Sequence, residues 1–310
     1  NVTTDLTVFN SYPVNRRMRI IFTENWQWFD AAGGVAYLNS FSDGSGDPCW
    51  VFTPLTGDQN GAGQAASHEG GHTFGLKHDG RTTPQEEYYL GNGSWAPVMG
   101  AGYDTPIVQW SKGEYPEASN VEDDLAIISS TSNGVGYRDD DYGNSIDKAS
   151  GLGSPAANTV NSSGIIETTG DVDMFAFSTT GGVANLVIAT PSPVNTQNLN
   201  IKATLYDANG VSVITQSPAA DTGATLATTL NPGIYYLAIE GDANGAWASG
   251  GFGNYGSLGA YTITGNIAGL GGAVAKITSP IPEKLSIIEG NGLYLTCLLY
   301  TSDAADEEDS

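Results

Sequence analysis

The chain has few basic residues, and their scarcity excludes some partners. Its 310 residues include 11 Lys plus Arg against 34 Asp plus Glu, which gives a formal net charge of −23. A surface of this sign repels nucleic acid and anionic lipid, so we expect no nucleic-acid partner. The acidity favours solubility, and part of it could serve calcium, which takes oxygen ligands.

Long apolar runs are also lacking. No run is long enough to span a bilayer, so we expect no membrane insertion. The first residues do not form a charged segment followed by an apolar one, which excludes a signal peptide at this position. The chain opens as though in the middle of a domain, and we expect a mature form or a fragment.

Cysteine is scarce as well, with only Cys49 and Cys297. The second lies in CLLYTSDAADE, residues 297–307, which reads like the translation of a sequencing adapter. We therefore expect residues 269–310 to be a linker followed by an artefactual, disordered tail. Cys49 is then either a buried thiol or the partner of a cysteine outside this chain, and the sequence leaves both open.

Residues 1–138 contain all three histidines. Strand patterns occur at 17–26 and 33–41, and a helix is predicted over 65–76 although adjacent glycines disfavour it. A second helix is predicted over 121–130, capped by Ser119 or Asn120.

Residues 139–268 contain no Cys or His and alternate between short strands and turns, which is typical of an antiparallel sandwich. The predicted strands are 165–170, 173–179, 184–190, 200–207, 211–216, 224–230, 233–241 and 259–267.

The segment HEGGHTFGLKHD, residues 68–79, has the spacing of a catalytic metal site. His68 and His72 lie four residues apart and share one helix face. Gly75 can adopt a positive φ, which would end the helix and turn His78 toward the same point. Three imidazole ligands leave a fourth zinc position for water, and Glu69 would lie beside it as a proton acceptor. Ordinary helix histidines are the less favoured interpretation, because every histidine of the chain falls at this spacing.

This segment is similar to the metzincin signature HExxHxxGxxH followed by Asp, in its reprolysin-like (adamalysin-like) form. Residues 33–128 resemble a bacterial subgroup of that family. The resemblance implies an α+β catalytic domain over 1–138, a mixed sheet with a zinc-binding helix, whose N-terminal part is missing. It implies that His68, His72 and His78 hold Zn²⁺ and that Glu69 is the general base.

The resemblance also implies a methionine turn under the zinc, and Met99 in Pro97–Gly100 fits it. Tyr103 follows this methionine by four residues instead of two; it could contact the transition state, but a core or turn tyrosine is the favoured interpretation. Asp79 could orient the backbone around the third ligand or cap a turn. Residues 33–41 would be the edge strand that binds substrate, with a buried central strand as the alternative.

Residues 164–182, GIIETTGDVDMFAFSTTGG, resemble the bacterial pre-peptidase C-terminal (PPC) domain, an all-β sandwich found behind secreted peptidases. Some relatives bind calcium or a matrix polymer such as collagen, and this implies an extracellular matrix polymer as a possible partner. Oxygen ligands for Ca²⁺ could come from five residues, although surface turn carboxylates are the favoured interpretation. These are Asp139, Asp141, Asn144, Asp171 and Asp173.

The sequence therefore predicts a secreted, extracellular zinc-dependent endopeptidase that hydrolyses protein or peptide substrates through a zinc-activated water. The resemblance implies that such an enzyme is made with a propeptide. The alternative is a non-catalytic extracellular binding or adhesion protein that uses its β-sandwich. The intact Glu69 favours the peptidase, because a degenerate site would be expected to lose its base early.

Overall fold

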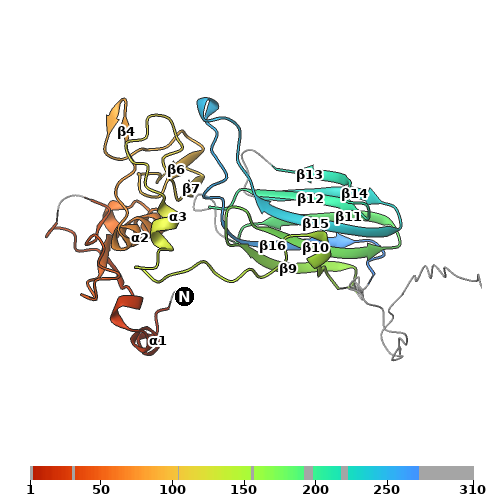
Figure 1. Cartoon of the computed structure of the whole chain (residues 1–310), viewed down its shortest axis with the longest axis horizontal. Helices are drawn as coiled ribbons and strands as arrows, with labels where there is room; N and C mark the ends of the chain where they lie inside the picture. Colours follow the sequence, from red (N-terminus) through yellow and green to blue (C-terminus); the bar gives the residue numbers. More distant parts are fainter. Residues whose placement is uncertain are drawn as a thin grey trace, which may run out of the picture. The chain divides into compact units, whose positions relative to one another are not determined.

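The described part of the chain is mainly β-structure with few helices (Figure 1). The computed structural model describes residues 3–29, 32–103, 105–154, 157–191, 198–217 and 223–271. The linker and tail are predicted over 269–310, and the part from residue 272 onward, with Cys297, lies outside the described residues. No helix within the described ranges combines the length and the hydropathy needed to cross a bilayer.

Residues up to 138, which we call the front region, contain one long helix and otherwise short elements joined by loops. Its helical segments are α1 (Leu6–Ser11), η1 (Val14–Arg16), η2 (Thr53–Leu55), α2 (Gln59–Phe74) and α3 (Asp124–Ile128). Its strands are β1 (Ile20–Thr23), β2 (Gly34–Val35), β3 (Cys49–Phe52), β4 (Arg81–Thr82), β5 (Gln85–Glu86), β6 (Trp95–Pro97) and β7 (Ile107–Gln109).

A small mixed sheet and helix α2 form the centre of the front region. The strand order is β1-β3-β2, with β1 parallel and β2 antiparallel to β3. Val51 of β3 packs against Ala62 and Ala65 of α2. The side chain of Asp58 accepts the Gly61 N–H and begins the helix, which therefore starts six residues before the predicted position at residue 65. A mixed sheet with a helix carrying two histidines is present, and membership of the metzincins stays a prediction.

The predicted strand 33–41 is wrong over most of its length. Only Gly34–Val35 pairs as a strand, at the edge of the described sheet. The N–H groups of Asn39 and Phe41 instead donate to the carbonyls of His72 and Thr73, at 3.0 Å each. The last carbonyls of a helix have no hydrogen-bond donor within the helix. The N–H groups of this segment donate to two of them.

The predicted cap of the second helix is also wrong. Helix α3 begins at Asp124, and the side chain of Asp123 caps it by accepting the Ala126 N–H. The side-chain oxygen of Asn120 instead accepts the Glu122 N–H at 3.0 Å. An Asn that bonds the backbone two residues on forms a turn and does not cap the helix.

Residues 139–271, which we call the sandwich region, form two antiparallel sheets apart from one short parallel strand. The sheet orders are β13-β12-β15-β10-β8 and β14-β11-β16-β9. The elements are η3 (Ile146–Lys148), β8 (Ser150–Gly151), β9 (Thr159–Ile166), β10 (Val172–Thr179), β11 (Gly182–Ala189), β12 (Ile201–Asp207), β13 (Ser212–Gln216), β14 (Ala224–Leu230), β15 (Gly233–Gly241), η5 (Trp247–Ser249) and β16 (Gly259–Ile267).

One continuous core lies between these sheets and contains apolar side chains from both. The predicted β-sandwich is therefore present. Leu270 still belongs to this core, so the packed region extends beyond the predicted boundary at 268. The strand predicted at 165–170 lies earlier, at Thr159–Ile166, because residues 167–171 form a turn closed by the side chain of Asp171, which accepts the Glu167 N–H.

The connection between β15 and β16, residues 242–258, packs on the front region. Phe252 and Trp247 contact a cluster that includes Trp95, and the rings of Trp95 and Trp247 meet edge to face at 5.0 Å. The hydroxyl of Tyr255 donates to Asp123 at 2.7 Å and accepts the Leu125 N–H at 2.9 Å. This connection is thus attached to the start of α3 and to the strand that leads into Met99.

Candidate metal centre

The three histidines of the chain lie together. His68 and His72 are one turn apart on α2, and His78 follows the left-handed Gly75 that ends the helix at φ 107°. The ligand nitrogens of the three rings lie within 4.8 Å of one another. Nε2 of His72 is 3.0 Å from Nε2 of His78.

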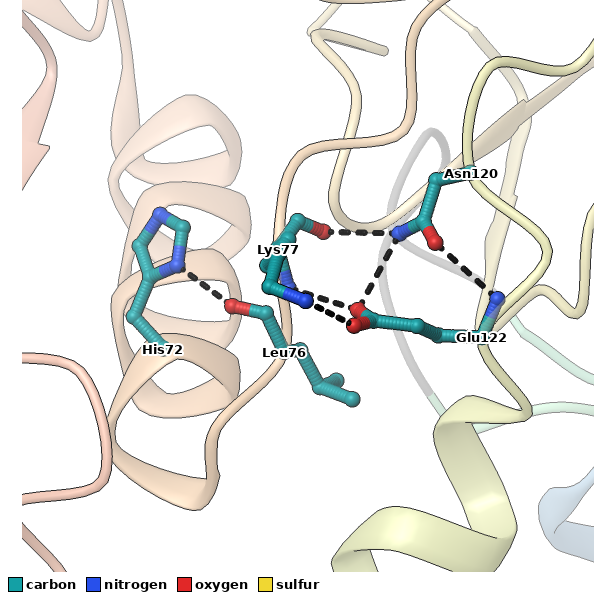
Figure 2. Close-up of polar contacts among 5 residues, drawn as sticks. All are labelled: His72, Leu76, Lys77, Asn120 and Glu122. Atoms are coloured by element: carbon teal, nitrogen blue, oxygen red, sulfur yellow. Dashed lines mark hydrogen bonds and ion pairs between the residues drawn. The ribbon is translucent and has the colours of Figure 1, made fainter.

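Each histidine is held through its other ring nitrogen. Nδ1 of His68 lies 2.9 Å from the Val98 carbonyl, and Nδ1 of His72 lies 2.8 Å from the Leu76 carbonyl (Figure 2). A carbonyl only accepts, so both Nδ1 atoms must carry the proton. This tautomer leaves the Nε2 lone pairs free for a metal.

These nitrogens fit a zinc ion. Two unprotonated Nε2 atoms at 3.0 Å repel unless a proton or a cation lies between them. Tetrahedral zinc with bonds of about 2.0–2.1 Å would place its nitrogen ligands roughly 3.3 Å apart. Burial, with a smaller effect of His72, lowers the pKa of His68 to about 3, and burial also lowers the pKa of His72. Both are neutral at pH 7, as a metal ligand must be.

The three histidines line a cavity, and Glu69, which follows His68, lines it too. Its side chain is 6% exposed, and burial raises its pKa to about 8. The cavity has a volume of roughly 550 Å³ and is bordered on one side by the edge strand at Gly34–Val35. A carboxylate, three imidazoles and an accessible strand edge thus surround one space.

Met99 lies in the core beside helix α2. It is fully buried with Leu76, Val98 and Val108. A Cβ atom on Gly71 of α2 would be only 2.5 Å from the Met99 sulfur. The second glycine of the motif is therefore required by the close approach of this methionine, which explains a residue that helix propensity disfavours.

The segment leading to His78 is fixed by a polar network (Figure 2). Glu122 accepts the Lys77 N–H at 3.1 Å and its ammonium at 2.7 Å. Asn120 donates to the Lys77 carbonyl at 3.3 Å. The ion pair at Lys77 is exposed and contributes little free energy, but together these bonds orient the backbone just before His78.

Asp79 connects the third histidine to the methionine turn through its backbone. Its N–H donates to the Met99 carbonyl at 2.8 Å, and its carbonyl accepts the Tyr89 N–H at 2.7 Å. Its carboxyl is buried, and one oxygen has no hydrogen-bond partner among the described residues. Burial, followed by the charges of Glu114 and Glu122, raises its pKa to about 7. Of the two roles considered, the backbone contacts favour orientation around the third ligand.

Tyr103 lies in a turn and not in the core, since its side chain is 38% exposed and lines the cavity. Burial, with the charge of Glu69 second, raises its pKa. Two further residues at the site were missed by the sequence reasoning. The Tyr88 ring lies 4.2 Å from the ring of His78, and Glu87 Oε1 lies 3.1 Å from its Nδ1. No spacing rule for a zinc motif points to either.

The acidic residues of the sandwich region form a second cluster. Carboxylate oxygens of Asp140, Asp171 and Asp173 lie within 4.8 Å of one another. The amide of Asn144 lies 3.1 Å from Asp171 Oδ1. One oxygen of buried Asp173 has no hydrogen-bond partner in the described chain, and burial is the main cause that raises its pKa to about 7.

Asp171, Asp173 and Asn144 therefore lie together with Asp140, a residue that the sequence analysis did not include. Asp139 and Asp141 lie outside this group of close oxygens. Asp139 is exposed, and burial is the main cause that raises the pKa of Asp141. Glu167, also missed, is buried, and neither of its side-chain oxygens has a partner within the described ranges.

Cys49 is a free, buried thiol. Burial is the main cause that raises its pKa to about 12, with Glu69 second. A raised pKa keeps the thiol protonated at neutral pH, which disfavours nucleophilic reactivity.

No protein-family model matches the chain, and no curated protein matches its sequence. Among solved structures, it is similar to the pre-peptidase C-terminal domain of a collagenase from Bacillus anthracis, with 13% identity over 40% of this chain and 100% of that one, at a TM-score of 0.27. It is also similar to a mitogen derived from Yersinia pseudotuberculosis, with 13% identity over 42% of this chain and 97% of that one, at a TM-score of 0.24.

Proposed function

We propose that this protein is a secreted zinc-dependent endopeptidase whose metal is held by His68, His72 and His78. The observation that supports this most directly is the convergence of three imidazole nitrogens within 4.8 Å, beside a buried carboxyl in one cavity. Catalytic zinc sites use three protein ligands and leave one position open. The extracellular location follows from the family that the sequence resembles.

Zinc at this site would supply Lewis acidity to a water molecule and to the scissile carbonyl. A zinc cation beside Glu69 would favour its ionised form. The carboxylate in the cavity would then accept the proton of the attacking water and return it to the leaving amine. The Val98 and Leu76 carbonyls hold the two helix histidines in the required tautomer. Strand β2 pairs only with β3 among the described strands, so its outer edge is available for the main chain of a peptide.

The test is a Glu69→Gln variant of the full chain. Glutamine keeps the shape and removes the base, so we expect casein cleavage to fall by about 10³-fold or more while bound zinc is unchanged. Glu86→Gln is the matched control, because Glu86 pairs with Arg81 and does not line the cavity. Equal cleavage by Glu69→Gln and the parent would disprove the mechanism.

Metal removal separates the peptidase from the alternative of a binding or adhesion protein. Phenanthroline should abolish cleavage, and added zinc should restore it. A protein that contains no transition metal when purified, and cleaves neither casein nor a peptide library, would leave the binding protein as the better description.

A second candidate function, calcium binding by the sandwich region, is favoured by the cluster at Asp140, Asp171 and Asp173. Buried carboxylates need a cation or a proton. We expect calcium, and magnesium much less, to raise the midpoint of thermal unfolding, and Asp173→Asn to remove this effect. No shift with millimolar calcium would leave Asp171 and Asp173 as buried carboxyl groups that hold no cation. Binding of a matrix polymer by the sandwich stays a prediction.

A further inference from the structure

The three proposed zinc ligands are not held in the same way. His68 and His72 lie on α2, and their Nδ1 atoms face main-chain carbonyls. His78 lies beyond the helix, and its Nδ1 faces the carboxylate of Glu87 at 3.1 Å. Only the third ligand therefore depends on a charged and replaceable side chain.

Glu87 contacts His78 through its side chain. It follows strand β5, and its side chain is 71% exposed, so it is not part of a core. The next residue, Tyr88, places its ring 4.2 Å from that of His78 and tilted by 39°. The two neighbours thus contact the His78 ring at its edge and on its face.

We propose that Glu87 is a positioning residue for the third zinc ligand. Its carboxylate accepts the Nδ1–H of His78, which fixes the tautomer and directs Nε2 to the point that Nε2 of His72 also faces. A carboxylate partner also makes the imidazole a stronger donor to the metal than a carbonyl partner does. This inference rests on the proposed zinc site.

The test compares Glu87→Ala and Glu87→Gln with the parent in the full chain. The measurements are zinc affinity by competition with a chelator and the visible absorption spectrum of the cobalt-substituted protein. Loss of such a partner typically weakens metal binding 10- to 100-fold, and we expect this for Glu87→Ala. Glu87→Gln keeps an acceptor oxygen without the charge and should fall between Glu87→Ala and the parent.

Glu86→Gln is the charge-matched control, because Glu86 is the adjacent residue but contacts Arg81. Its zinc affinity should stay within about twofold of the parent. Since Glu87 is exposed, unfolding midpoints in chelator should be equal for all variants, which separates positioning from folding.

Two outcomes overturn the inference and can be told apart. If the parent binds zinc and Glu87→Ala binds it equally, with an unchanged cobalt spectrum, Glu87 does not position the ligand and the peptidase proposal is untouched. If the parent takes up no zinc, both proposals fail together.

Discussion

The front region and the sandwich region differ in how their apolar side chains are packed. The sandwich region has one continuous core to which both sheets contribute. The described residues of the front region form three small separate clusters, around Trp95, Met99 and Val51. The 242–258 connection contributes Phe252 and Trp247 to the first of them. Because apolar burial scales with area, we expect the sandwich core to supply more of the folding free energy than the small clusters of the front region do.

Specific polar contacts of the front region are gathered around the histidines. Main-chain carbonyls, a carboxylate and the Lys77–Glu122–Asn120 network all converge on the segment 68–79. Such a site places polar groups in a buried position, which costs free energy unless something compensates. We therefore expect a metal bound at the proposed site to stabilise the front region and to leave the sandwich unaffected.

The largest expected effect is that of metal removal. At free zinc of about 1,000 times the dissociation constant, binding adds about 4 kcal/mol to the free energy of unfolding. Chelation should remove this from the front region alone. Five of the six tryptophans lie before residue 139 and the sixth lies in the 242–258 connection, so tryptophan fluorescence reports the front region. Far-UV circular dichroism reports mainly the sandwich strands.

We expect chelator to lower the midpoint seen by fluorescence and to leave the midpoint seen by circular dichroism unchanged. Equal shifts of both signals would show that the two regions unfold as one unit, and the comparison would then be incorrect.

The next effect comes from the sandwich core. Leu237 on β15 is fully buried, so Leu237→Ala should cost about 3 kcal/mol through lost burial and the cavity left behind. Zinc content should not change. Val187→Ala on the outer face of β11, where the side chain is 41% exposed, is the matched truncation and should cost under about 0.5 kcal/mol. Similar losses in both variants would contradict a core confined between the sheets.

The two regions also differ in how far the sequence predicts them. Alternation and turn residues predict three sandwich strands to the residue, at 224–230, 233–241 and 259–267. There the same periodicity that marks the strand also determines its buried face. The front region lacks this redundancy, and segment 33–41 shows why: its alternation resembles a strand, but its N–H groups pair with the end of α2.

For the candidate site, the sequence predicts residues whose spacing along one helix implies proximity. His68, Glu69 and His72 are of this kind, and Gly75 adds the turn toward His78. Glu87 and Asp140 could not be predicted, because their contacts depend on how loops fold back. Chain distance carries no information about such contacts, and one sequence alone supplies no other signal.

A smaller effect is expected inside helix α2. Alanine is the better helix former by about 1 kcal/mol, but a Cβ at Gly71 would lie 2.5 Å from the Met99 sulfur. We expect the cost of this clash to exceed the gain in helix propensity. Gly71→Ala should therefore lower the free energy of unfolding of the front region by about 2 kcal/mol. Gly63→Ala in the same helix meets no atom within 4 Å and should stabilise it by up to about 1 kcal/mol. Stabilisation by both variants would refute a packed methionine turn.

The smallest effect tests the attachment between the two regions. Tyr255→Phe removes a hydroxyl that donates to Asp123 and accepts from Leu125, at the start of α3. We expect a loss of about 1 kcal/mol in the fluorescence transition, because one buried N–H is left unpaired. Tyr235→Phe is the control, since its hydroxyl contacts only the Asn231 carbonyl within the sandwich and should leave fluorescence unchanged. An unchanged fluorescence transition in Tyr255→Phe would mean that the 242–258 connection does not support α3.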